Sequence, residues 1–141
     1  LPIFTVSGEL SASVQSWSRR ASEDAWSRGW RLVDQTPSSS DSTAVPSAIV
    51  PGPESQLLVA NRGVGTCGVL SGPLGHHKLI DEFSLGGVQP RDVTSDGDQL
   101  WVAEQADGAV LCLHRSSEGW RQRLRLDLPG ASRVLIGPTL G

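Results

Sequence analysis

The sequence predicts an all-β fold, a segment of a β-propeller built from about three four-stranded antiparallel blades. A strand-like hexapeptide occurs three times, at intervals of 53 and 43 residues. A period in this range, carried by strand-like sequence, is typical of propeller arrays. Further short β-rich runs flank each copy, which gives about four strands per repeat. The three copies are residues 4–9, 57–62 and 100–105.

The main alternative is a β-sandwich with short strands, which requires no internal repeat. The propeller is favoured because individual residues recur at equivalent positions, in addition to the pattern of hydrophobicity. The 16 Gly and 9 Pro among 141 residues suit many short strands joined by tight turns, and they disfavour a helical bundle.

The chain divides into blade-like units that are not equally complete. Residues 1–36 form an incomplete blade without an inner strand, and a Ser-rich stretch, 36–43, is expected to be an exposed linker. Residues 44–87 and 88–128 each form a blade whose first strand ends in a Pro/Gly or Asp-Gly turn. Residues 132–137 are expected to form a closing strand that completes a blade begun elsewhere in a ring. The β-rich runs predicted as strands are 4–8, 11–17 and 30–34, then 47–52, 57–61, 66–70 and 78–85, and finally 91–97, 100–104, 108–114 and 120–128.

Three blades cannot close a ring, because propellers usually have about four to eight. An open arc leaves apolar blade faces in water, and such faces are association surfaces. We therefore expect either self-association of this chain or further N-terminal blades.

The charge balance excludes some classes of partner. The chain has 12 basic and 15 acidic residues and a net charge of −3, which argues against binding to nucleic acid or to a membrane surface. No stretch approaches the roughly 20 apolar residues of a membrane span. Arg121, Arg123 and Arg125 alternate with other residues, so we expect them to share one face of a solvated outer strand rather than to form an anion-binding stripe.

The cysteines and histidines do not form a metal-binding pattern. Cys67 and Cys112 fall in the third strands of neighbouring blades, and we interpret them as buried free thiols in a reducing compartment, which favours a cytoplasmic location. His76 and His77 are adjacent, so their side chains point in different directions and are poorly placed to share a metal. We expect neither a metal nor a cofactor.

One position of the repeat carries three unlike polar residues. Glu9, Arg62 and Gln105 each end a copy of the hexapeptide. A position repeated around a ring can face a shared central site, so these residues are the first candidates for function.

Ordered motifs along the chain resemble a known family. The set resembles the C-terminal part of the lactonase-family seven-bladed β-propellers, which include cycloisomerase-type 6-phosphogluconolactonases and fungal carboxy-muconate cyclases. The resemblance covers essentially the whole chain, and it implies that the blades belong to a seven-bladed ring. The motifs are Gly8-Glu9-Leu10, Asn61-Arg62-Gly63, Pro90-Arg91-Asp92 before Asp96-Gly97, Ala103-Glu104-Gln105 and the segment from Pro129 to Ile136.

The resemblance also implies an active site on the central channel, made by a His, two Arg and a Glu. By this resemblance Glu9 and Arg62 are the catalytic Glu and one catalytic Arg, while the His and the other Arg would lie before residue 1. Arg91 resembles an inner-strand Arg that contacts the substrate anion, and Gln105 is a further candidate for substrate binding. Two departures from the family are Gly8 in place of the usual Asn, and the run 45–48, where an acidic residue is common.

These residue types fit the chemistry of an anionic lactone. Guanidinium groups bind carboxylate or phosphate bidentately, a carboxylate can move the proton that ring opening or closure requires, and nearby Arg can hold the oxyanion. The resulting hypothesis is an enzyme that hydrolyses or forms a lactone of a sugar acid or a muconate-type acid. One alternative is a non-catalytic propeller segment that binds a protein partner, and another is a truncated, inactive product. The structural alternative for Glu9 and Arg62 is an ordinary ion pair between blades.

Overall fold

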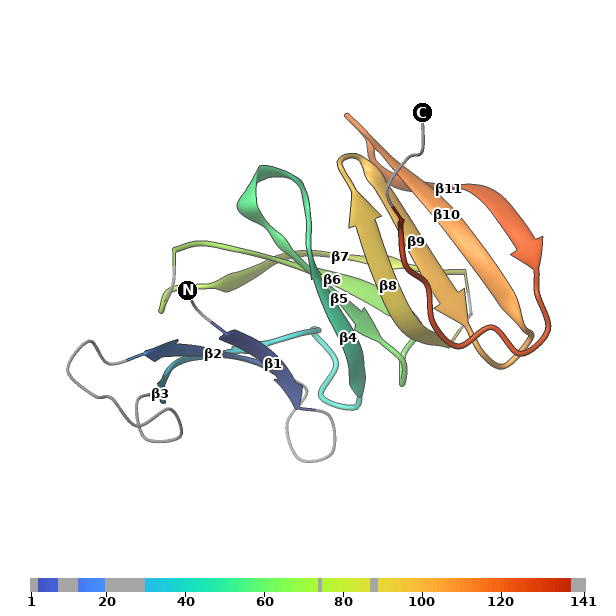
Figure 1. The fold of residues 1–141 in the computed structure, drawn as a ribbon. Helices are drawn as coiled ribbons and strands as arrows, with labels where there is room; N and C mark the ends of the chain where they lie inside the picture. Colours follow the sequence, from blue (N-terminus) through green and yellow to red (C-terminus); the bar gives the residue numbers. More distant parts are fainter. Residues whose placement is uncertain (1–2, 8–12, 20–29, 74, 87–88, 138–141) are drawn as a thin grey trace.

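The computed structural model describes residues 3–7, 13–19, 30–73, 75–86 and 89–137. These ranges contain three separate antiparallel sheets (Figure 1). The first contains β1 (Ile3–Ser7), β2 (Ser13–Arg19) and β3 (Trp30–Pro37), in that order. The second contains β4 (Pro46–Pro51), β5 (Leu57–Asn61), β6 (Thr66–Ser71) and β7 (Lys78–Ser84), and the third contains β8 (Pro90–Asp96), β9 (Gln99–Glu104), β10 (Ala109–Ser116) and β11 (Gly119–Asp127). The helical part of the described chain is one short 3-10 turn, Pro53–Ser55.

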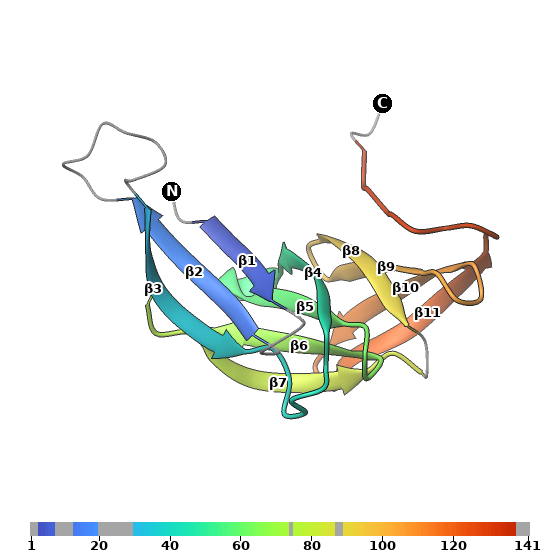
Figure 2. The ribbon, with the colours of Figure 1, turned by 90° about the horizontal axis from the view of Figure 1, so that it is seen from below.

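The three sheets are arranged as successive blades. β4 contacts both β1 and β8, so the first strands of neighbouring sheets lie beside each other (Figure 2). The three copies of the hexapeptide fall on β1, β5 and β9, in three different sheets, and β5 and β9 are each second in their own sheet. The prediction of an all-β propeller segment is therefore confirmed.

The second sheet buries both of its faces. Neighbouring side chains of a strand point to opposite faces, and consecutive residues of β5 accordingly enter different clusters. Leu58 packs with Leu100 and Leu111 of the third sheet, whereas Leu57 packs with Val14 of the first. At the outer strands Phe83 stacks on Trp120, with ring centroids 6.0 Å apart. Burial of these alternating side chains fixes the register of each blade.

The Ser-rich stretch differs from the exposed linker that the sequence predicted. Ser38 and Ser39 are buried. The Glu82 carboxylate of β7 accepts hydrogen bonds from the Ser39 hydroxyl, from the backbone N–H and hydroxyl of Ser40, and from the Thr66 hydroxyl. A side chain at Gly68 would overlap the carbonyl oxygen of Ser38, so the stretch crosses the second sheet at close range.

Two further predictions need correction. Residues 132–137 form no strand, although they lie beside the edge strand β8. The Val134 N–H donates to the Asp92 side-chain carboxylate of that strand at 3.0 Å, and not to a backbone carbonyl as in a ladder. The three arginines of β11 do not share one face, because the register with β10 shifts at Arg123. This β-bulge pairs Arg121 with His114 and Arg125 with Leu111, which lie on opposite faces of β10.

Candidate functional site

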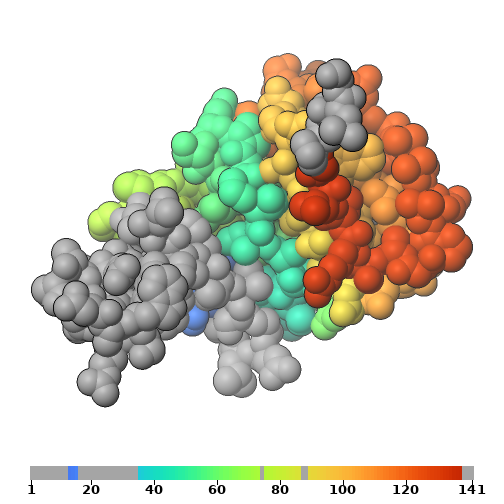
Figure 3. Space-filling view, in the orientation of Figure 1, coloured from blue at the N-terminus to red at the C-terminus, as the bar shows by residue number. Residues whose placement is uncertain are grey.

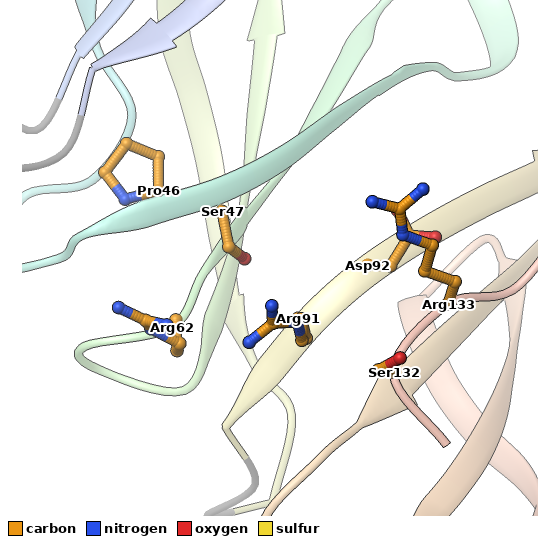
Figure 4. A pocket seen from close by; sticks show the side chains of 7 residues that line it. All are labelled: Pro46, Ser47, Arg62, Arg91, Asp92, Ser132 and Arg133. Atoms are coloured by element: carbon orange, nitrogen blue, oxygen red, sulfur yellow. The ribbon is translucent and has the colours of Figure 1, made fainter. Parts of the chain in front are cut away.

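A cavity of about 440 Å³ opens where the first strands of the second and third sheets begin (Figure 4). This volume is within the usual range for small-molecule sites, about 300 to 1,000 Å³. Its walls come from β4, β8, the turn after β5 and the segment that follows the third sheet. The lining residues are Pro46, Ser47, Arg62, Arg91, Asp92, Ser132 and Arg133.

The same irregularity occurs in both inner strands at the cavity. The register between β4 and β5 shifts at Ser47, and the register between β8 and β9 shifts at Arg91. A β-bulge leaves one residue out of the ladder and redirects its side chain, and bulges are common beside active sites. Ser47 and Arg91 therefore occupy equivalent positions in successive blades, and both face the cavity. The Ser47 hydroxyl also donates to the Pro90 carbonyl at 2.9 Å, which ties the two inner strands together.

The position of Arg62 is fixed by its backbone. Its N–H donates to the Val45 carbonyl at 3.0 Å, and the next N–H, of Gly63, donates to the Ala44 carbonyl at 2.7 Å. Val45 has φ of 50°, a left-handed conformation that is strained for a β-branched residue. A side chain at position 63 would overlap the carbonyl oxygen of Thr43, which explains the glycine there. The conformation of Val45 thus orients its carbonyl toward the Arg62 N–H, and this hydrogen bond holds Arg62 beside the cavity.

Arg91 is held by Gln105. The Arg91 Nη1 donates to Gln105 Oε1 at 2.6 Å. Gln105 sits on a turn that the buried Glu104 carboxylate organises by accepting the N–H groups of Ala106 and Asp107, each at 2.8 Å. Gln105 does not line the cavity, and the contact that the structure gives it is with Arg91. Its role in substrate binding stays a prediction.

The cavity is rich in unpaired positive charge. Arg62, Arg91 and Arg133 all line it, and within the described chain none of them forms an ion pair with a carboxylate. Asp92 is the acidic residue of the lining, and one of its oxygens accepts the Val134 N–H. The arrangement can bind an anionic group bidentately through guanidinium nitrogens.

The structure brings together part of the site that the sequence predicted. Arg62 and Arg91, assigned to different blades, line one cavity. Glu9 lies outside the described residues. The catalytic and binding roles of these residues remain predictions. Arg133, which also lines the cavity, was not among the predicted site residues, because its segment was interpreted as a closing strand. The contact with Asp92 that holds this segment is visible only in the structure.

The described ranges contain no group of three or more His, Cys, Asp or Glu side chains placed to hold a metal ion. No helix in that part of the chain has the length and apolar character needed to cross a membrane. Both cysteines are free and buried, as the sequence predicted. Burial raises the pKa of the Cys67 thiol to about 12.

Fold and cavity together define a β-propeller segment with an arginine-lined pocket at the start of its inner strands. The model of the family "Lactonase, 7-bladed beta-propeller" matches residues 2–134, and the chain belongs to this family. A search among curated proteins found no match.

Two solved structures share the fold. One is a protein from Lactobacillus plantarum, 12% identical with a TM-score of 0.71, for which the match covers 89% of this chain and 39% of that one. The other is a Bacteroides fragilis protein described as a proposed 6-phosphogluconolactonase, 14% identical with a TM-score of 0.71, and here the match covers 94% of this chain and 40% of that one. This chain therefore spans about two fifths of the length of these structures.

Proposed function

We propose that this chain forms part of a lactonase-type enzyme that hydrolyses or forms a lactone of an anionic sugar acid or a muconate-type acid. Family membership supports lactonase-type function in general. The observation that carries the proposal for this chain is that Arg62 and Arg91, from neighbouring blades, line one cavity without a carboxylate partner among the described residues. Unpaired guanidinium groups converging on a cavity are suited to an acidic ligand.

In the proposed mechanism the two arginines bind the carboxylate or phosphate of the substrate and stabilise negative charge on oxygen as the ring opens or closes. Ser47, presented by the bulge in β4, donates its hydroxyl proton to the Pro90 carbonyl, and its oxygen can accept a hydrogen bond from a sugar hydroxyl. Glu9 would move the proton, as the family resemblance implies. The same resemblance implies a His and a second Arg as further members of the site. No metal or cofactor is part of this scheme.

A non-catalytic role in binding a protein partner is the second candidate, and one observation favours it. Leu124, Leu126 and Leu128, on and just after the outer strand of the third sheet, are 43%, 41% and 48% exposed. Apolar side chains gathered on one edge are typical of association surfaces. We propose that this surface contacts another copy of the chain or further blades. We also propose that the cavity binds the small anionic substrate, and that neither nucleic acid nor a membrane is a partner. We also propose a cytoplasmic location, in keeping with the two free thiols.

The experiment that tests the enzymatic proposal is a lactone-turnover assay on a complete homologous chain that carries the corresponding substitutions. Arg62→Ala removes a cavity guanidinium and is expected to lower kcat/KM by at least about tenfold, the effect of losing one charge-assisted contact. Arg123→Ala, on the exposed outer strand, is the matched control and is expected to leave turnover unchanged. Equal effects of the two substitutions would contradict the proposed site, and absence of lactone turnover in the unsubstituted chain would favour the non-catalytic role.

A further inference from the structure

Arg133 lies at the edge of the cavity, on a segment that is anchored on both sides. Before it, the Ala131 N–H donates to the Leu128 carbonyl at 3.0 Å. After it, the Val134 N–H donates to Asp92 Oδ2 at 3.0 Å. The backbone of this segment is therefore held against β8, and Figure 3 shows the segment in red on the surface beside the yellow and orange of the third sheet. Arg133 is an exposed residue of this segment (Figure 4).

The net charge of the lining exceeds the single negative charge of one carboxylate. The lining holds three arginines and one aspartate, a net charge of +2. Among the described residues Asp92 forms no ion pair with a guanidinium, and one of its oxygens accepts the Val134 N–H. One guanidinium nitrogen of Arg91 is engaged by the neutral amide of Gln105, which leaves its charge unpaired. A ligand with two negative charges would balance this lining.

The arginines are spread along the cavity. Figure 4 shows Arg91 between Arg62 and Arg133, with Ser47 on the side of Arg62 and Asp92 on the side of Arg133. Arg62 and Arg91 arise from the second and third blades and can clamp one acidic group between them. Arg133 lies beyond Arg91 as seen from Arg62, on the segment that follows the third sheet, and is suited to a second group at the other end of the ligand.

We propose that Arg133 determines specificity by contacting a second acidic group, so that the preferred ligand carries two, either a phosphate and a carboxylate or two carboxylates. The proposal rests on the proposed function, because it places the ligand in the same cavity. Arg133 comes from outside the repeated strands, and its contact requires a second acidic group that Arg62 and Arg91 alone do not require.

The test is calorimetric titration of the 141-residue chain at low ionic strength with two probes. 2-Phosphoglycolate carries a phosphate and a carboxylate, whereas methyl phosphate carries the phosphate alone. Arg133→Gln is expected to raise the Kd for 2-phosphoglycolate about fivefold, as for loss of one solvent-exposed charge pair, and to leave the Kd for methyl phosphate unchanged. Arg133→Lys should recover part of the loss. Arg123→Gln is the control for net charge and should change neither Kd.

The other outcomes separate this inference from the proposed function. If Arg62→Gln weakens both probes while Arg133→Gln weakens neither, the second contact is wrong and the cavity remains the site. If Arg133→Gln weakens both probes equally, Arg133 belongs to the first contact and the requirement for two groups is wrong. If neither Arg62→Gln nor Arg133→Gln changes either Kd, or if neither probe binds, the cavity is not the anion site and both proposals fail. Far-ultraviolet circular dichroism of each variant ensures that a lost signal does not reflect unfolding.

Discussion

Glu82 is the best place to test how the Ser-rich stretch is held, because one carboxylate accepts four hydrogen bonds from three residues. Two of these come from the hydroxyls of Ser39 and Thr66 in partly buried surroundings, and two come from the exposed Ser40. A partly buried hydrogen bond contributes about 1 kcal/mol to stability, and exposed ones contribute little. Glu82→Ala should therefore lower the free energy of unfolding by about 2 kcal/mol, or Tm by about 6 °C for a chain of this size.

The interaction also predicts a dependence on pH. Burial by itself raises the pKa of Glu82, but the hydrogen bonds from Ser39, Thr66 and Ser40 outweigh it and hold the pKa below its ordinary value. A carboxylate whose pKa is lower in the folded state stabilises the fold above its unfolded pKa, and this contribution is lost as the pH falls through the folded pKa. The difference in stability between the parent chain and Glu82→Ala should therefore be full at neutral pH and shrink in acid.

The assay is urea-induced unfolding followed by circular dichroism from neutral to acidic pH. Glu118→Ala is the matched control, because Glu118 is an exposed carboxylate paired with the exposed Arg121, and its loss should change the free energy of unfolding by less than about 0.5 kcal/mol. Equal losses in the two variants, or a loss at Glu82 that does not change with pH, would refute the reasoning.

Three further predictions concern packing, thiol reactivity and association. Gly68→Ala should lower the free energy of unfolding by about 1 to 3 kcal/mol, since the added methyl group overlaps the Ser38 carbonyl. Gly137→Ala, with open space around it, is the control. Equal urea midpoints for the two variants would contradict the close approach of the Ser-rich stretch to the second sheet. Cys67, with its pKa raised to about 12, should resist iodoacetamide at pH 8 in the folded chain and react on unfolding, as peptide mapping would show; alkylation at the unfolded rate would disprove its burial. Sedimentation at micromolar concentration should show self-association of the isolated chain through its exposed leucines, and a monodisperse monomer that unfolds cooperatively would mean that the arc is self-sufficient.

The sequence predicted the blades well because strand propensity, turn residues and the repeat are local or periodic properties. Leu57 and Leu58 alternate between two clusters as a period of two requires. Arg62 was assigned to a central site because its position recurs around the ring, and Arg91 because its motif resembles an inner-strand Arg of the family. The structure places both in one cavity.

The errors share a different physical origin. Burial of Ser39 depends on Glu82, 43 residues further along the chain, and composition alone cannot reveal such a partner. The bulge at Arg123 shifts the register with β10, which no alternation of residue types indicates. Arg133 reaches the cavity because its neighbour bonds to Asp92, 42 residues earlier. For Ser39 and Arg133 a specific long-range contact overrides the local pattern, and at Arg123 a single extra residue interrupts it.

The matching bulges at Ser47 and Arg91 separate the shape of the pocket from its chemistry. Each bulged residue lies outside the ladder of hydrogen bonds, so its side chain can be exchanged without breaking strand pairing. One blade offers a small hydroxyl at this point and the next a long cation, on nearly the same backbone. A ring built in this way can change its ligand one blade at a time, because each blade contributes its own side chain to a common wall.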